Sequence, residues 1–175
     1  MASLQDDQLI FGKFKIDKSQ IFYESPLKLT NGIVNLRPIV LGHVLVIPKR
    51  ITPKLADLTD EEYDDLWRSA RIIQKALESH YNATGFNVAV QDGRSAGQSV
   101  PHVHIHILPR KEGDFERNDD VYDALEVWAP TEAMVEEKMN NKAGLEVPDD
   151  EDRKDRTMKM MEDECMIYRK LLEGK

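Results

Sequence analysis

The sequence contains a single cysteine, Cys165, in 175 residues. One thiol excludes an internal disulfide and a four-cysteine zinc site, which favours a reducing compartment. Residues 1–8 lack the basic flank and the apolar run of a signal peptide, and their acidic residues are atypical of a mitochondrial presequence. We therefore expect the protein in the cytoplasm or the nucleus.

Long apolar runs and excess positive charge are also missing. The longest nearly apolar stretch, from Ile39 to Ile47, is interrupted by Gly42 and His43 and is far shorter than the roughly 20 residues of a spanning helix. The formal net charge of −8 disfavours non-specific binding to phosphate backbones. We expect neither a membrane nor a nucleic acid as partner, whereas a small phosphorylated ligand needs only a few converging donors.

The motifs of the common nucleotide-binding folds are absent, because no Gly-x-Gly-x-x-Gly follows a strand and no Gly-Lys-Ser/Thr loop occurs. The 41% hydrophobic content is enough for one core of ordinary domain size. Strands in the first half and one long central helix indicate an α+β domain on an antiparallel sheet. We expect this domain over 1–128, a charged flexible linker over 129–156 and a closing helix over 157–175.

Turn residues between apolar and β-branched runs predict the strands. The expected strands cover 11–22, 27–36, 42–47, 86–91 and the histidine run at 102–108. The third of these ends at Pro48, which cannot donate to a ladder. The residues of 92–99 are small, polar and rich in glycine, which is typical of a tight loop.

Two helices are predicted from spacing. Thr59 and Glu62 form a capping box, and an apolar stripe at steps of three and four follows, which predicts a helix over 60–81 ending near Asn82. A second stripe near the C-terminus predicts an amphipathic helix that docks on the domain. Its members are Met158, Met161, Cys165, Tyr168 and Leu172.

Three of the five histidines, His102, His104 and His106, occupy alternate positions of an apolar strand. Side chains alternate faces along a strand, so these rings should share one face about 7 Å apart, while Val103 and Ile105 face the core. Packing alone explains the pattern poorly, because each buried ring needs a hydrogen-bond partner.

The spacing leaves three interpretations open. The histidines are ordinary residues of a polar sheet face, or two of them bind zinc with a third ligand such as Asp92. All three rings would not reach one ion, since the outer pair lies about 13 to 14 Å apart along a strand. In the third interpretation an imidazole attacks phosphorus to form a phosphoramidate, and backbone donors of 97–100 assist.

The run His102–Leu108 resembles the histidine-triad signature, in which three histidines alternate with apolar residues. The segments around it are similar to the fragile-histidine-triad branch of that superfamily, whose members hydrolyse dinucleoside polyphosphates. The similarity covers 11–125, with a weaker likeness to fungal members in 151–154 and in the last helix. The motifs that carry it are 35–38, 42–46, 91–93, 96–100 and 108–115.

The resemblance implies a histidine-triad fold, with an antiparallel five-stranded sheet, one long helix and a homodimer in which two sheets become continuous. It implies hydrolysis of diadenosine triphosphate to AMP and ADP through a covalent AMP–histidine intermediate. Two other functions stay open: an adenosine phosphoramidate hydrolase, typical of the sister branch, and a nucleotide-occupied signalling protein with slow turnover. No tightly bound metal is implied, although Mg²⁺ or Mn²⁺ would accompany the polyphosphate.

Carried over position by position, the resemblance makes His104 the nucleophile on the α-phosphate. His106 lies beside it against the phosphate or the departing oxygen, and His43 and His102 are supporting rings. Asn35 is expected near the ribose, and Gln98 as a mobile, neutral donor. The full set of implied phosphate and substrate contacts is Asn35, Gln91, Gly97, Gln98, Ser99, Val100 and His106.

The resemblance leaves the role of two aromatic positions open. Phe14 stands where some animal members have a histidine, so the adenine contact differs, and an aromatic ring there is either a stacking platform or part of the core. Tyr122 aligns with a phosphorylatable tyrosine of animal relatives, and packing or simple exposure explains it equally well.

Overall fold

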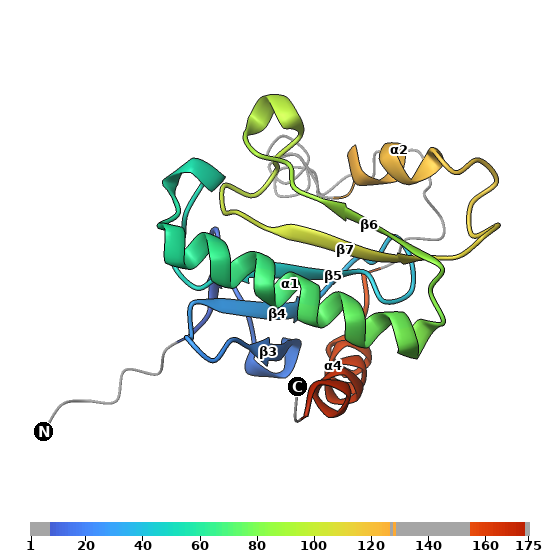
Figure 1. Ribbon diagram of the computed structural model, residues 1–175, viewed down its shortest axis with the longest axis horizontal. Helices are drawn as coiled ribbons and strands as arrows, with labels where there is room; N and C mark the ends of the chain where they lie inside the picture. Colours follow the sequence, from blue (N-terminus) through green and yellow to red (C-terminus); the bar gives the residue numbers. More distant parts are fainter. Residues whose placement is uncertain (1–7, 127, 129–154, 174–175) are drawn as a thin grey trace, which may run out of the picture.

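The computed structural model describes residues 8–126, 128 and 155–173, and its centre is one antiparallel sheet of five strands (Figure 1). The strand order is β3-β4-β5-β7-β6. A separate hairpin of β1 (Ile10–Phe11) and β2 (Phe14–Lys15) precedes the sheet. The predicted α+β architecture is therefore confirmed. The five sheet strands are β3 (Ile21–Glu24), β4 (Thr30–Val34), β5 (Val44–Pro48), β6 (Gly85–Ala89) and β7 (Ile105–Arg110).

The long helix α1 (Asp60–Tyr81) crosses one face of the sheet, over β4, β5 and β7. Its start matches the prediction, because Thr59 accepts from the backbone N–H of Glu62 while the Glu62 carboxylate accepts from that of Thr59. Bonds from Arg50, with these capping bonds, lower the pKa of Glu62 to about 2. Asn82 ends the helix in the left-handed conformation.

The C-terminal helix α4 (Met158–Leu172) packs beside α1 and against β3 and β4 (Figure 1). Met161, Cys165 and Tyr168 are buried in the same core as α1, as the stripe predicts, whereas Met158 is half exposed. The expected linker falls mostly on 129–154, which lie outside the described residues. Its last two residues, Asp155 and Arg156, are described and are bonded to the segment after β4.

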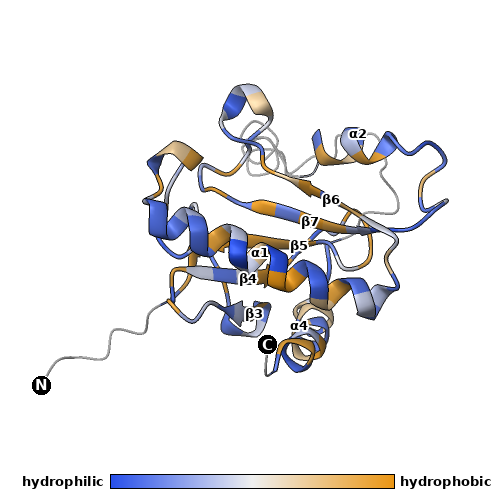
Figure 2. Ribbon diagram, in the orientation of Figure 1, coloured by the Kyte–Doolittle hydropathy of each residue, from blue (hydrophilic) through white to orange (hydrophobic). Residues whose placement is uncertain are grey.

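Alternation along the strands separates two faces. Val44, Val46, Ile105 and Ile107 join the core beneath α1 and α4. Figure 2 shows the apolar character of β5 and the mixed character of α1, whose polar side faces solvent. The opposite face carries a smaller apolar cluster and the histidines. That cluster consists of Leu9, Phe11, Ile33, Leu45, Ile47, Val100 and Trp128.

The strand expected over 11–22 is wrong. Gly12 has a φ of +60° and turns the chain into the β1–β2 hairpin, and a Cβ there would lie 2.6 Å from a Val100 methyl carbon. Asp17 then caps a short 3₁₀ helix, Lys18–Gln20, so only β3 pairs with the sheet. Local capping and a close approach between distant segments outweigh strand propensity here.

The remaining connections include a short helix, α2 (Asp120–Glu126), which packs on the histidine face through Val121 and Leu125. Its packing partners include Leu108 at the end of the histidine run. Within the described part of the chain, no helix combines the length and the apolar character needed to cross a bilayer.

Candidate active site

Strand β7 and the residues just before it place the three histidines of the run on the face opposite α1. Regular pairing begins at Ile105, because the backbone N–H of Val103 donates to Thr52 rather than to a neighbouring strand. The predicted alternation of faces is nonetheless confirmed, since Val103 and Ile105 lie in the main core. The rings of His104 and His106 lean together to a centroid distance of 4.9 Å, closer than a straight strand predicts.

All four histidines at this face are fully buried: His43, His102, His104 and His106. The interpretation as half-exposed surface residues is therefore wrong. Burial penalises the charged ring, and it lowers the pKa of His102, of His104 to about 4 and of His106 well below the ordinary value. All three rings of the run are neutral at pH 7.

His102 uses both ring nitrogens on the backbone. Its Nδ1 accepts from the N–H of Gly12 at 3.1 Å, so its Nε2 carries the proton and donates to the carbonyl of Pro48 at 2.8 Å. The ring thereby joins the β1–β2 hairpin to the end of β5. This geometry supports the predicted supporting role, because neither nitrogen is left for a ligand.

A relay of hydrogen bonds fixes the proton of His106. The backbone N–H of Ile39 donates to Nδ1 of His43 at 3.0 Å, so the proton of His43 is on Nε2. That nitrogen donates to Nδ1 of His106 at 3.0 Å. The tautomers follow from these partners, and they leave Nε2 of His106 as a protonated donor.

His104 has the opposite tautomer. Its Nδ1 lies 2.7 Å from the carbonyl oxygen of His102, which can only accept, so Nδ1 carries the proton. Nε2 of the neutral ring is therefore an unprotonated lone pair. Two neighbouring rings thus present a nucleophilic nitrogen, on His104, and an N–H donor, on His106.

Four buried polar atoms at this face have no hydrogen-bond partner: Ser99 Oγ, His104 Nε2, His106 Nε2 and Trp128 Nε1. They are four of the seven such atoms found among the described residues, and the rest lie on α1 and β4. Buried polar groups are almost always bonded, so a cluster of unbonded ones indicates a site that binds a polar ligand.

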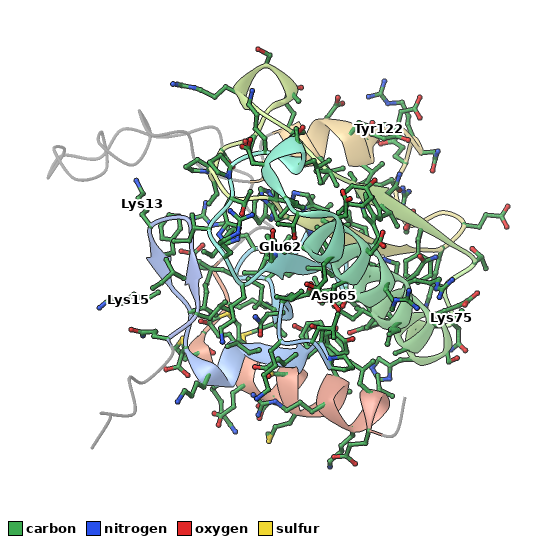
Figure 3. The ribbon with its side chains drawn as sticks, turned by 60° about the vertical axis from the view of Figure 1, so that its left-hand side comes forward. Lys13, Lys15, Glu62, Asp65, Lys75 and Tyr122 are labelled. Carbon is green, nitrogen blue, oxygen red and sulfur yellow. The ribbon has the colours of Figure 1, made fainter. Side chains whose placement is uncertain are left out.

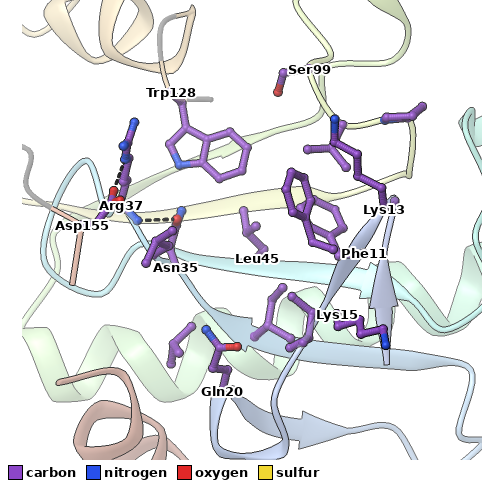
Figure 4. Close-up of a pocket in the computed structure, with 18 of the residues that line it drawn as sticks. Phe11, Lys13, Lys15, Gln20, Asn35, Arg37, Leu45, Ser99, Trp128 and Asp155 are labelled. Carbon is purple, nitrogen blue, oxygen red and sulfur yellow. Dashed lines mark hydrogen bonds and ion pairs between the residues drawn. The ribbon is translucent and has the colours of Figure 1, made fainter. Parts of the chain in front are cut away.

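A cavity of about 630 Å³ lies beside these atoms (Figure 4). Its volume is in the range of roughly 300–1,000 Å³ typical of small-molecule sites. Phe11 and Trp128 line the cavity and also contact the ring of His104, at centroid distances of 5.2 and 5.7 Å. Cavity and histidines therefore share two walls, and Ser99 also lines the cavity (Figure 4).

Sequence reasoning missed Trp128, which packs on three histidine rings and lies 4.6 Å from the His106 centroid. The available signal was the spacing of Val121, Ala124, Leu125 and Trp128, which continues the apolar stripe of α2 by one turn. Tyr122 lies on the other side of that helix and is 56% exposed (Figure 3).

The hairpin supplies the aromatic and basic part of the cavity wall. Phe14 lines the cavity with 44% of its surface exposed, which leaves a face for an adenine ring. Phe11 is buried against His102 and His104. Lys13 and Lys15 also line the cavity and project outward from the hairpin (Figure 3).

The loop before the histidine run is held in shape by its own amides. Gly97 has a φ of +86°, and a Cβ there would lie 2.6 Å from Nε2 of Gln91, so this amide packs directly on the glycine. Gln98 donates to the carbonyl of Pro53 at 2.8 Å and accepts from the N–H of Gly93 at 3.1 Å. Its expected role as a mobile donor stays a prediction, and that role requires these two bonds to exchange.

Asn35 and Val100 complete the predicted set, and both line the cavity. The amide N–H of Asn35 donates to the unprotonated Nδ1 of His43 at 3.4 Å, and its Oδ1 accepts from the N–H of Arg37 at 3.0 Å (Figure 4). Val100 is buried under the hairpin. Asn35, Ser99 and Val100 thus line the cavity, and the four histidines lie behind two of its walls, Phe11 and Trp128. Gln91, Gly97 and Gln98 do not line it.

The zinc interpretation finds little support in this geometry. Among the described residues, no group of three or more histidine, cysteine, aspartate or glutamate side chains is arranged to hold a metal ion. Asp92, the suggested third ligand, accepts from the backbone N–H of Leu55. The donor and acceptor roles of the two free ring nitrogens differ, which suits a phosphate group better than an ion.

Comparisons with known proteins agree with the site. A family model described as the HIT domain matches residues 15–113. The bifunctional bis(5'-adenosyl)-triphosphatase/adenylylsulfatase FHIT of Arabidopsis thaliana is 47% identical over 163 residues, 93% of this chain and 83% of that protein. The asymmetrical bis(5'-nucleosyl)-tetraphosphatase of Schizosaccharomyces pombe is 47% identical over 168 residues, 90% of this chain and 91% of that protein.

A solved structure shares the fold. Plasmodium falciparum diadenosine triphosphate hydrolase superposes with a TM-score of 0.70 at 27% identity, over 96% of this chain and 86% of that one. The chain therefore belongs to the HIT, or histidine-triad, family. Within that family, its relatives place it in the fragile-histidine-triad branch that the motifs around His102–Leu108 indicate.

Proposed function

We propose that the protein hydrolyses diadenosine triphosphate to AMP and ADP. One observation carries the proposal: Nε2 of His104 is an unpartnered lone pair and Nε2 of His106 an unpartnered N–H, on two rings that contact each other and pack on Trp128, a wall of the cavity. The names of the Arabidopsis and Plasmodium relatives support this substrate.

In the first step, Nε2 of His104 attacks the α-phosphorus of a nucleotide bound in the cavity. A nitrogen–phosphorus bond forms, the bond to the bridging oxygen breaks, and ADP leaves with that electron pair. The N–H of His106 bonds to the departing or a non-bridging oxygen. The positive charge that develops on His104 is stabilised through its Nδ1–H bond to the carbonyl of His102.

In the second step, water attacks the same phosphorus, and the nitrogen–phosphorus bond breaks. The electron pair returns to Nε2 of His104, and AMP and a proton are released. The low pKa of His104 keeps the ring neutral and ready for the next attack at physiological pH. Asn35 would contact the ribose, and Ser99 Oγ and the backbone of 97–100 would supply further donors to phosphate.

The relatives differ in the length of the phosphate chain that their names give. The relatives' names include a triphosphatase and a tetraphosphatase at equal identity, and the Arabidopsis protein is also named an adenylylsulfatase. The three names share a nucleotidyl group, adenylyl in two of them, which is the part that the cavity and His104 would hold. Mg²⁺ or Mn²⁺ would enter with the polyphosphate and screen its leaving group.

We also propose a homodimer formed through β6. Among the described strands, β6 is the last in the sheet order and pairs only with β7, whereas β3 at the other end is covered by α4. Val88 on β6 is 39% exposed. Two such edges would pair into one continuous sheet. Sedimentation equilibrium should give twice the mass of one chain, and a monomer at micromolar concentration contradicts the proposal.

Turnover measurements with the full chain test the activity. Release of AMP from diadenosine triphosphate should exceed release from adenosine phosphoramidate. Any activity that is lost in EDTA should return when Mg²⁺ is restored. Diadenosine tetraphosphate and adenylyl sulfate, measured in parallel, define the substrate range. An alkaline quench, which preserves nitrogen–phosphorus bonds, should leave one adenylyl group on the wild type and none on His104→Ala.

Each alternative predicts a different result. Preference for the phosphoramidate indicates the sister activity, and tight nucleotide binding with negligible hydrolysis indicates a signalling protein. If turnover survives in His104→Ala but is lost irreversibly when a chelator is added, the result indicates that the histidines bind zinc.

A further inference from the structure

A chain of side-chain contacts runs from the C-terminal helix to the catalytic histidines. It begins at Tyr168 and Glu164 on α4, passes through Arg156, which precedes the helix, and reaches Asn35 after β4. Asn35 contacts His43, which in turn bonds to His106. Arg156 is separated from Asn35 by 121 positions in the sequence.

Arg156 holds the backbone of the segment after β4 through several bonds. Its Nε donates to the carbonyl of Asn35 at 2.9 Å, Nη2 donates to the same oxygen, and its own backbone N–H donates to the carbonyl of Leu36 at 3.1 Å. The neighbouring Asp155 pairs with Arg37. Residues 155 and 156 thus hold both ends of a three-residue segment that lines the cavity.

The guanidinium of Arg156 is itself fixed from α4. Nη1 donates to Oε2 of Glu164 at 2.5 Å, and these two side chains are only 12% and 13% exposed. The other carboxylate oxygen of Glu164 accepts from the Tyr168 hydroxyl at 2.6 Å, and Tyr81 of α1 bonds to that hydroxyl at 2.6 Å. A nearly buried ion pair with every oxygen bonded has one geometry rather than many.

Asn35 transmits this geometry to two parts of the site. Its amide is in contact with the ring of His43, whose Nε2–H sets the tautomer of His106. The same side chain faces the cavity where the nucleoside would bind. A displaced Asn35 backbone would therefore disturb the nucleoside contact and the donor on His106 together.

We propose that Arg156, held by Glu164, is a positioning residue that fixes Asn35 and, through His43, the proton-bearing face of His106. The proposal rests on the proposed function for its kinetic consequences. Its structural consequence, the tautomer of His43 and His106, is independent of turnover.

A second arginine also bonds helix α4 to backbone carbonyls, and it supplies a matched control. Arg169 of α4 donates to the carbonyls of Ile21 and Lys18, at the far end of the helix and away from the histidines. Loss of Arg169 removes bonds between α4 and backbone carbonyls without touching Asn35. A purely structural role of α4 predicts equal effects from Arg156→Ala and Arg169→Ala.

The experiment compares Arg156→Ala, Arg156→Lys and Arg169→Ala in the full chain. We expect kcat/KM for diadenosine triphosphate to fall about ten-fold in Arg156→Ala, since charge-assisted bonds to a supporting segment are lost. Both KM and kcat should change. Arg156→Lys, which keeps one donor for the Asn35 carbonyl, should recover part of the loss, and Arg169→Ala should keep wild-type kcat and KM.

Imidazole ¹⁵N NMR provides the readout that does not depend on activity. In the wild type, His43 and His106 should each show one protonated and one unprotonated nitrogen, both with the proton on Nε2. Arg156→Ala should shift or broaden these resonances while those of His102 stay unchanged. If Arg156→Ala leaves kcat, KM and the spectrum at wild-type values, or if Arg169→Ala changes them equally, the proposal is overturned.

Glu164→Gln covers the case in which Arg156→Ala does not fold, because it keeps the shape and removes only the charge. The same spectral and kinetic changes, at smaller amplitude, are expected. A wild-type enzyme without turnover but with the predicted tautomers would reject the proposed function and leave the positioning role standing. Unchanged spectra in Glu164→Gln would reject the positioning role.

Discussion

The two faces of the sheet are built by the same strands, yet they bury different chemistry. Beneath α1 and α4, residues such as Val46 and Ile105 form a continuous apolar core. On the opposite face, alternate positions of β7 and of the residues just before it carry imidazoles, four buried polar atoms have no partner, and a cavity opens beside them. Along one segment of the chain, the residues on one face thus stabilise the fold and the alternate residues on the other face form the candidate site.

The sharpest way to test this division is to change the two faces of one strand separately. His104→Ala should lower turnover by roughly four orders of magnitude or more, because the nucleophile is removed. The free energy of unfolding should fall less than in a core truncation, because removal of a buried, unbonded nitrogen offsets part of the lost packing and of the lost bond to His102. Steady-state kinetics and urea unfolding measure both, and residual activity within ten-fold of wild type would contradict the assigned role.

Ile105→Ala changes the next residue, on the core face, and should have the converse effect. Ile105 is fully buried, so its truncation should lower the free energy of unfolding by about 2–5 kcal/mol. Turnover per folded molecule should stay near wild type. Ile105→Val is the milder control, with an expected cost of about 0.5–1.5 kcal/mol. A large loss of kcat in the folded Ile105→Val protein would break the proposed separation of faces.

Acid should affect the histidine face and leave the apolar face unchanged. An unfolded histidine takes up a proton near pH 6.5, whereas His104 in the folded protein does so only near its pKa of about 4. Protonation therefore favours unfolding, and stability should fall as the pH falls from about 6.5 toward 4. Urea unfolding at several pH values measures this, and the Ile105→Val protein should show the same slope.

The acid limb of kcat/KM follows from the same pKa. Activity should persist to about pH 5 and fall as His104 is protonated near pH 4. If kcat/KM instead fell near pH 6.5, the ring of His104 would not be buried away from water in the active enzyme.

The smallest expected effect concerns fluorescence. The chain has two tryptophans, Trp67 on α1 and Trp128 against the histidines. AMP binding should change the emission of Trp128 because a nucleotide would lie against its ring, and Trp128→Phe should abolish the change. Trp67→Phe, on the helix face, is the matched control and should preserve it. If the fluorescence change were lost in Trp67→Phe instead, the ligand would bind on the face of the sheet that α1 covers.

Sequence patterns predicted the parts of the molecule whose causes are local. The capping box of Thr59 and the apolar stripe predicted a helix over about 60–81, where α1 lies, and alternation predicted that Val103 and Ile105 oppose the histidines. The hairpin at 10–15 was missed, because its turn depends on contact between Gly12 and the distant Val100.

The finer features of the site depend on contacts that no local pattern encodes. The tautomers of His104 and His106 are decided by a backbone carbonyl and by His43, 63 positions away from His106. Trp128 and Arg156 reach the site from outside the matched family region, which ends at residue 113. The place of His104 on the histidine face was thus predictable from the sequence, and its role as nucleophile stays a prediction, whereas its orienting partners required the fold.

The single cysteine also decides how the protein can be labelled. Cys165 is fully buried on α4, and burial raises the pKa of its thiol to about 11, so little thiolate is available to react at neutral pH. A cysteine introduced at an exposed position such as Val88→Cys would therefore take up a maleimide dye alone. Spectroscopic distances across a β6–β6 interface become measurable in a chain that keeps its native thiol.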